Sequence, residues 1–121
     1  PIISYAWRDL SPDDMDRQAA FLASMGFNMV RIHANLAKVE QGAAITDVNM
    51  KEVEGIQRFA KSCRDHGIYM TISPWWGYHK VPDSWGLAGY TWEGGKFPFG
   101  PMFFNDEFQE GYKAWVRALY D

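Results

Sequence analysis

Two glycines constrain the fold of this chain more than any other feature. Gly26 and Gly67 each follow a stretch whose apolar residues have helical spacing, and each precedes a short run of apolar and β-branched residues. Glycine often ends a helix because it adopts a left-handed backbone conformation at little steric cost. The pattern therefore predicts two helices that each pass through a tight turn into a buried strand.

Three successive strand and helix units can be laid out around these turns. The expected strands cover residues 2–7, 27–33 and 68–74. The first helix starts at Ser11 and Pro12, the second at Asn49 with Glu52 completing a capping box, and the third at Asn105 or Asp106. The apolar stripes of the three helices are Met15, Ala19, Leu22 and Met25; Val53, Ile56, Ala60 and Cys63; and Phe108, Tyr112, Trp115 and Leu119.

Alternation along the strands predicts which side chains face the helices. In the second strand, Val30 and Ile32 face them, whereas Met29, Arg31 and His33 share the opposite face. In the third strand, the residues expected to face the helices are Ile68, Met70 and Ile72. Short helix-to-strand turns and long strand-to-helix loops indicate an α/β fold with a parallel sheet. Its binding site is expected beyond the carboxyl ends of the strands.

The segment after the third strand is rich in aromatic residues and has no regular pattern. Aromatic residues make up 17% of the chain. This segment carries eight of them: Trp75, Trp76, Tyr78, Trp85, Tyr90, Trp92, Phe97 and Phe99. Loops longer than about 12 to 15 residues are usually functional or disordered, and this one lacks the polar composition of disorder. We interpret it as the wall of a binding cleft.

Charge and composition exclude several partners. The net charge is −3 and the chain has no stripe of Lys and Arg, so nucleic acid is not an expected partner. No apolar run reaches the roughly 18 residues of a membrane span. The single cysteine and three scattered histidines give no metal-ligand spacing, so neither a metal nor another cofactor is expected. The compartment stays open, with a secreted or periplasmic location preferred.

Three segments together resemble a known enzyme family. They are GFNMVRIH, RDHGIYMTISPWW and FFNDEFQEGYKAWVRAL. In this order they look like the first part of the (β/α)8 catalytic domain of clan A glycoside hydrolases, which include cellulases, mannanases and β-galactosidases. The resemblance covers Ile2 to Tyr120. It implies that residues 1–121 are about three βα units of a TIM barrel, truncated before the fourth strand.

The resemblance also implies roles for individual residues. Arg31 matches the arginine that hydrogen-bonds the nucleophilic carboxylate, although the same residue could form a structural ion pair. The acid/base and the nucleophile of such enzymes follow the fourth and seventh strands, so neither lies in this chain. Trp75 stands where many relatives have a histidine. A carbohydrate substrate is implied, and its expected contacts are His33, Trp75, Trp76, Tyr78, Trp85, Trp92 and Glu93.

Each of these contacts has a structural alternative. His33 is about as well explained as a buried structural histidine, and one of Trp75 and Trp76 is expected to pack in the core. Trp115 is assigned to packing. Two other functions also fit the sequence: a non-catalytic carbohydrate-binding piece, and another TIM-barrel enzyme. In the leading interpretation, the third-strand edge meets either the remaining barrel segment or another chain.

Overall fold

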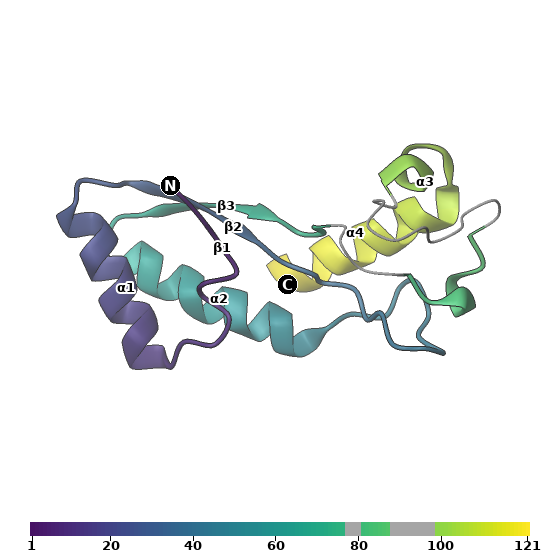
Figure 1. Cartoon of the computed structure of the whole chain (residues 1–121), viewed down its shortest axis with the longest axis horizontal. Helices are drawn as coiled ribbons and strands as arrows, with labels where there is room; N and C mark the ends of the chain where they lie inside the picture. The colour runs from purple at the N-terminus through teal and green to yellow at the C-terminus, as the bar shows by residue number, and fades with distance from the viewer. Residues whose placement is uncertain (77–80, 88–98) are drawn as a thin grey trace. The chain divides into compact units, whose positions relative to one another are not determined.

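The computed structural model describes residues 1–76, 81–87 and 99–121 (Figure 1). Contacts divide the chain into two compact units. The sheet unit comprises Pro1–Ala34 and Met50–Pro74, and the aromatic unit comprises Asn35–Asn49 and Trp75–Asp121. Each unit has a core of its own.

A three-stranded parallel sheet forms the sheet unit, as predicted. Its strands are β1 (Ile2–Ser4), β2 (Met29–His33) and β3 (Tyr69–Ser73), in the order β1-β2-β3. β2 and β3 are in continuous register from Met29 opposite Tyr69 to His33 opposite Ser73. The α/β class with parallel strands is therefore confirmed.

The first strand is shorter than the sequence predicts. It ends at Ser4 instead of Trp7, because Ser4 adopts a left-handed conformation with φ of 50° and the pairing with β2 shifts between Ile2 and Ser4. Two hydrogen bonds then form a turn, from Ala6 N to Ile3 O and from Arg8 N to Tyr5 O. Tyr5 and Trp7, which follow Ser4, therefore lie outside the sheet.

Two helices cover one face of the sheet (Figure 1). They are α1 (Pro12–Ser24) and α2 (Met50–Asp65). The Ser11 hydroxyl caps α1 by accepting a hydrogen bond from Asp14 N at 3.1 Å. Gly26 and Gly67 come after the helices with φ of 86° and 73°, values that glycine adopts readily. Both predicted helix ends are thus confirmed.

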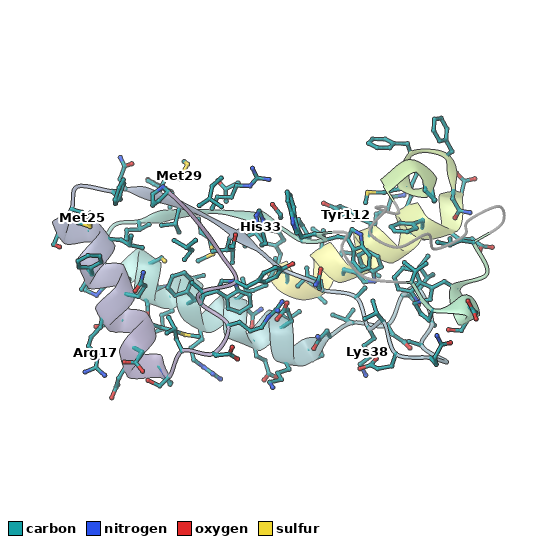
Figure 2. All side chains as sticks on the ribbon, in the orientation of Figure 1. Arg17, Met25, Met29, His33, Lys38 and Tyr112 are labelled. Atoms are coloured by element: carbon teal, nitrogen blue, oxygen red, sulfur yellow. The ribbon has the colours of Figure 1, made fainter. Side chains whose placement is uncertain are left out.

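The core of the sheet unit lies between these helices and the sheet. Val30 and Ile32 are fully buried. The helices contribute Met15, Ala19, Leu22, Val53, Ile56, Phe59 and Cys63, all buried. Met29 is 53% exposed and projects from the opposite face of the sheet (Figure 2). The predicted alternation of β2 is therefore correct, whereas Met25 lies at 58% exposure and does not join the helical stripe.

The helix α2 starts directly after Asn49, as predicted, but the contact expected from the Glu52 carboxylate back to the Asn49 N–H does not form. The backbone N–H of Asn49 donates to Leu36 O at 2.7 Å, and the carboxylate of Glu52 binds Arg8. A partner 44 residues away thus replaces the local contact that the sequence pattern suggests.

The aromatic unit contains one long helix and several irregular segments. The long helix is α4 (Asp106–Tyr120), and Asn105 caps it by accepting a hydrogen bond from Phe108 N at 2.8 Å. A short helix, α3 (Phe99–Phe104), and a 3-10 turn, η1 (Asp83–Trp85), fall where the sequence predicts a loop. Isolated bridges pair Asn35 with Trp75 and Ala37 with Val48.

Four aromatic rings form the centre of this unit. Trp75 stacks on Trp115 with ring centroids 5.3 Å apart, and both also contact Trp85 and Phe108. The indole N–H of Trp115 donates to Ile45 O at 2.7 Å. Gly111 is buried, and it lies close to the same Ile45 carbonyl. The predicted stripe of α4 is therefore a packing surface. Within the described ranges, no helix has the length and hydropathy to cross a bilayer.

Candidate functional site

Three polar side chains lie close together near the carboxyl end of the sheet in the sheet unit. Arg31 and His33 come from β2, and Ser73 from β3. His33 and Ser73 are register partners. Arg31 lies two residues before His33, on the same face of β2. Its guanidinium donates to the Ser73 hydroxyl from Nε at 3.3 Å and from Nη2 at 3.1 Å. Parallel pairing thus brings these three side chains together, as alternation predicts for Arg31 and His33.

His33 is buried at the end of β2 (Figure 2), with only 7% of its surface exposed. Its ring meets the ring of Tyr5 edge to face, with centroids 6.0 Å apart. Burial lowers the pKa of His33, and the nearby positive charge of Arg31 lowers this pKa further. The imidazole is therefore held neutral near pH 7, when one ring nitrogen donates a hydrogen bond and the other accepts one.

Arg8 and Glu52 form an ion pair next to the Tyr5 ring. The carboxylate of Glu52 is 6% exposed and accepts hydrogen bonds from Arg8 Nε at 2.7 Å and from Arg8 Nη2. The same guanidinium lies 4.2 Å from the centroid of the Tyr5 ring, within range of a cation–π interaction. We refer to Tyr5, Arg8, Arg31, His33, Glu52 and Ser73 together as the carboxyl-end cluster.

The sequence pattern alone does not single out half of this cluster. It places Tyr5 and Arg8 in the first strand and its loop, and Glu52 in a helix cap. The available signal is the position of Tyr5 near the end of the first apolar run and of Arg8 directly after it, because carboxyl ends of neighbouring parallel strands lie at one edge of a sheet. Alternation alone does place Ser73 on the same face as Arg31.

The predicted aromatic contacts divide into three groups. Trp75 and Trp85 are 4% and 3% exposed, so neither ring presents a face for stacking on a sugar. Trp76 is half-buried, and its backbone N–H donates to Asn35 Oδ1 at 3.3 Å. Tyr78, Trp92 and Glu93 lie outside the described residues. Trp75 is thus the packing member of the tryptophan pair, and a sugar contact by Trp76 stays a prediction.

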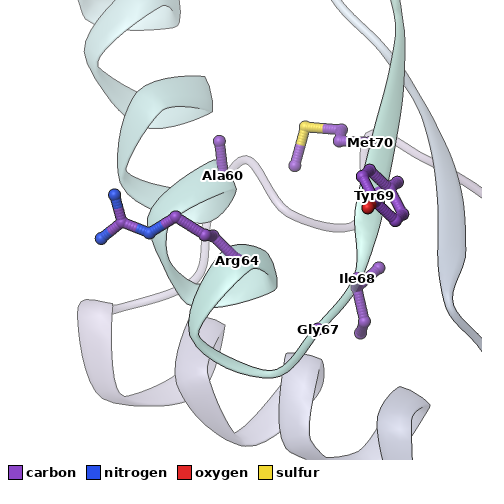
Figure 3. Close-up of a pocket in the computed structure, with 6 residues that line it drawn as sticks. All are labelled: Ala60, Arg64, Gly67, Ile68, Tyr69 and Met70. Atoms are coloured by element: carbon purple, nitrogen blue, oxygen red, sulfur yellow. The ribbon is translucent and has the colours of Figure 1, made fainter.

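A separate pocket lies beside β3 in the sheet unit (Figure 3). Its volume is about 360 Å³, and its lining residues are Ala60, Arg64, Gly67, Ile68, Tyr69 and Met70. Gly67 and Ile68 precede the strand, which places the pocket towards the amino end of β3. It is therefore distinct from the carboxyl-end cluster.

The chemistry open to the carboxyl-end cluster is binding and orientation. Arg31 offers several N–H donors in a planar fork, a geometry suited to a carboxylate. Glu52 is engaged by Arg8, which argues against its use as a nucleophile or proton donor. Within the described segments, no group of three or more His, Cys, Asp or Glu side chains is placed to hold a metal ion.

Comparisons of the chain with protein-family models, curated proteins and solved structures give no significant match.

Proposed function

We propose that this chain is part of a retaining glycoside hydrolase that cleaves O-glycosidic bonds in a β-linked polysaccharide or oligosaccharide. In this proposal the sheet unit supplies the first strands of a (β/α)8 barrel. The observation that carries it is the position of Arg31, at the middle of β2 on the sheet face opposite the helices, with its guanidinium reaching the Ser73 hydroxyl at the carboxyl end of β3. That is the place at which the resembling family has its nucleophile-binding arginine.

The mechanism explains why an arginine is needed there. A retaining glycosidase uses one carboxyl group as acid and then base, and a second one, roughly 5 to 5.5 Å away, as nucleophile. The nucleophile must be ionised and correctly aimed. A guanidinium favours the ionised form by its charge and fixes the geometry through paired hydrogen bonds. Arg31 takes this role, and both carboxyl groups come from later βα units.

The uncovered face of the sheet supports the barrel assignment. Met29 is 53% exposed and Tyr69 is 75% exposed on the face that α1 and α2 do not cover. Parallel sheets are almost always covered on both faces. A barrel covers this face with side chains from the remaining strands and pairs the outer edge of β3. The proposed partner at that edge is accordingly the remaining barrel segment.

A non-catalytic carbohydrate-binding piece is less well supported. That function depends on exposed aromatic rings, and two of the predicted rings, Trp75 and Trp85, are buried. It also gives no reason for the Arg31 guanidinium to reach the carboxyl end of β3. Fold alone does not decide between a glycosidase and another TIM-barrel enzyme.

The test uses the complete protein that contains this chain and a panel of aryl β-glycosides. We expect release of the aryl group and, after rapid acid quenching, a protein mass increased by one glycosyl residue, because retention proceeds through a covalent intermediate. Binding of oligosaccharides without any turnover would favour the carbohydrate-binding piece. The absence of both binding and turnover across the panel would contradict the proposal.

A further inference from the structure

The carboxyl-end cluster contains a chain of contacts that the proposed function does not use. It begins where β1 ends. Ser4 is held in a left-handed conformation, φ 50°, which is unfavourable for a residue other than glycine. Such a conformation persists where surrounding contacts determine it, and it occurs often at functional sites. Here it turns the chain so that Tyr5 comes to lie beside the end of β2.

Trp7 anchors this turn. Its indole N–H donates to the backbone carbonyl of His33 at 3.1 Å, and its side chain is buried. The ring also packs tightly on α2, because a Cβ atom placed on Gly55 would lie only 2.9 Å from Trp7 Cζ3. Gly55 thereby allows α2 to approach the turn closely. Glu52 lies one helical turn before Gly55, which brings its carboxylate within reach of Arg8.

A series of contacts leads from Glu52 through Arg8 and Tyr5 to the imidazole of His33. Glu52 holds both Nε and Nη2 of Arg8, so the plane of the guanidinium is set by two hydrogen bonds. The guanidinium lies over the Tyr5 ring at 4.2 Å, and the Tyr5 ring meets the ring of His33. Rotation of His33 towards Tyr5 is opposed by a ring that is itself clamped.

We propose that Glu52 and Arg8 are positioning residues, which fix the orientation of the His33 ring through Tyr5. The ring nitrogens of the oriented imidazole then point in a fixed direction at the carboxyl end of β2. The identity of its ligand, a sugar hydroxyl, rests on the proposed function. The orientation itself does not, and it can be measured without a ligand.

The alternative is that the ion pair only ties the turn after β1 to α2. Removing it would then change stability and leave the two rings in contact. An electrostatic effect on His33 is also separable from positioning. Loss of the Arg8 charge and loss of the Glu52 charge would shift the pKa of His33 in opposite directions, whereas loss of positioning separates the rings in both variants.

The experiment is proton NMR of the chain and its variants. The readout is the nuclear Overhauser cross-peak between the ring protons of Tyr5 and His33, which the edge-to-face contact predicts to be present. The variants are Arg8→Met, Arg8→Lys and the isosteric Glu52→Gln. We expect the cross-peak to weaken in all three, most in Arg8→Met, with the His33 ring signals shifted. Arg8→Lys retains the charge but loses the planar fork.

Two controls accompany these variants. Arg17→Met removes an exposed arginine that pairs with Asp14 on α1, and it should leave the cross-peak intact. His66 serves as an internal reference, because it directly follows α2, and the helix from Glu52 to its end at Asp65 spans about 20 Å at the helical rise. Its ring signals should stay in place throughout.

An unchanged Tyr5–His33 cross-peak in folded Glu52→Gln and Arg8→Met would overturn the positioning role. If Arg8→Met does not fold, Glu52→Gln decides, because it keeps the size of the side chain and one acceptor. Glycosidase activity plays no part in this readout. Failure of the proposed function and failure of the positioning role are thus distinguishable.

Discussion

Arg31 and Ser73 are joined across the β2–β3 pair by two hydrogen bonds, from Nε and Nη2 of the arginine to the serine hydroxyl at 3.3 and 3.1 Å. Both bonds lie on the exposed face of the sheet. A hydroxyl that accepts from two nitrogens fixes the plane of a guanidinium. The relationship therefore sets the direction of the Arg31 side chain towards the carboxyl end of β3.

Ser73→Ala should cost little stability. An exposed hydrogen bond contributes about 1 kcal/mol or less, because water replaces the lost partner. Unfolding of the chain in urea measures the difference. Ser24→Ala is the matched control, since the Ser24 hydroxyl is also exposed and donates to Phe21 O. A loss above about 3 kcal/mol for Ser73→Ala alone would indicate a buried structural role for Arg31.

Gly111→Ala should destabilise the aromatic unit. A Cβ atom at Gly111 would lie 2.7 Å from Ile45 O and 2.8 Å from Ile45 Cγ1, and a backbone carbonyl moves aside only at a cost. We expect a loss of about 1 to 3 kcal/mol, measured by chemical unfolding followed by tryptophan fluorescence.

The control for Gly111 is Gly100→Ala in α3, where an added Cβ meets nothing within 4 Å. Alanine favours a helix over glycine by up to about 1 kcal/mol, so this variant should be neutral or stabilised. Equal effects of the two substitutions would show that α4 does not approach Ile45 closely.

Cys63 should resist alkylation in the folded chain. Its side chain is 1% exposed, and burial raises the pKa of the Cys63 thiol to about 11. The thiolate is the form that iodoacetamide alkylates. The raised pKa therefore lowers the rate of Cys63 alkylation at least about 100-fold near pH 8. Iodoacetamide labelling followed by mass spectrometry gives this rate. The chain in urea is the control, and equal rates in both conditions would contradict the burial of α2 against the sheet.

His33 should make stability depend on pH. Burial, and secondarily the charge of Arg31, lower the pKa of His33 in the folded state. The unfolded chain then binds more protons as the pH falls through about 6.5, so stability is full above that value and decreases below it until the folded pKa is reached. Urea unfolding at about pH 7.5 and about pH 5.5 tests this window. His33→Gln should lose less stability over the same interval, and an equal loss in both proteins would contradict the lowered pKa.

Local periodicity predicted much of the sheet unit. Alternation in β2 separated Val30 and Ile32 from Met29 and Arg31, because successive side chains of a strand point to opposite faces whatever the rest of the chain does. The glycine stops at Gly26 and Gly67 were readable for a similar reason, since the left-handed turn is a property of single residues.

Local sequence patterns do not predict contacts between residues that lie far apart in the chain. Glu52 had a local capping pattern, and only the folded chain brings Arg8 to it. The first apolar run gave no sign that the chain would leave the sheet after Ser4, because Tyr5 and Trp7 are as compatible with a strand as with a buried turn. Trp75 and Trp85 had the same ambiguity. A tryptophan in an irregular segment suits a sugar-binding wall or a core, and α4 supplies the packing partner that decides for the core.

The most direct test of the proposed function is the activity of Arg31→Lys in the complete enzyme. Lysine keeps the positive charge but loses the planar fork that aims the nucleophile. We expect kcat to fall about 100-fold or more, the scale of misplacing a catalytic group by an ångström, with little change in Tm. Arg17→Lys, an exposed arginine of α1, is the control and should retain activity. Nearly intact activity together with a collapse in Tm for Arg31→Lys would contradict the account, because Arg31 would then be a structural residue of the sheet.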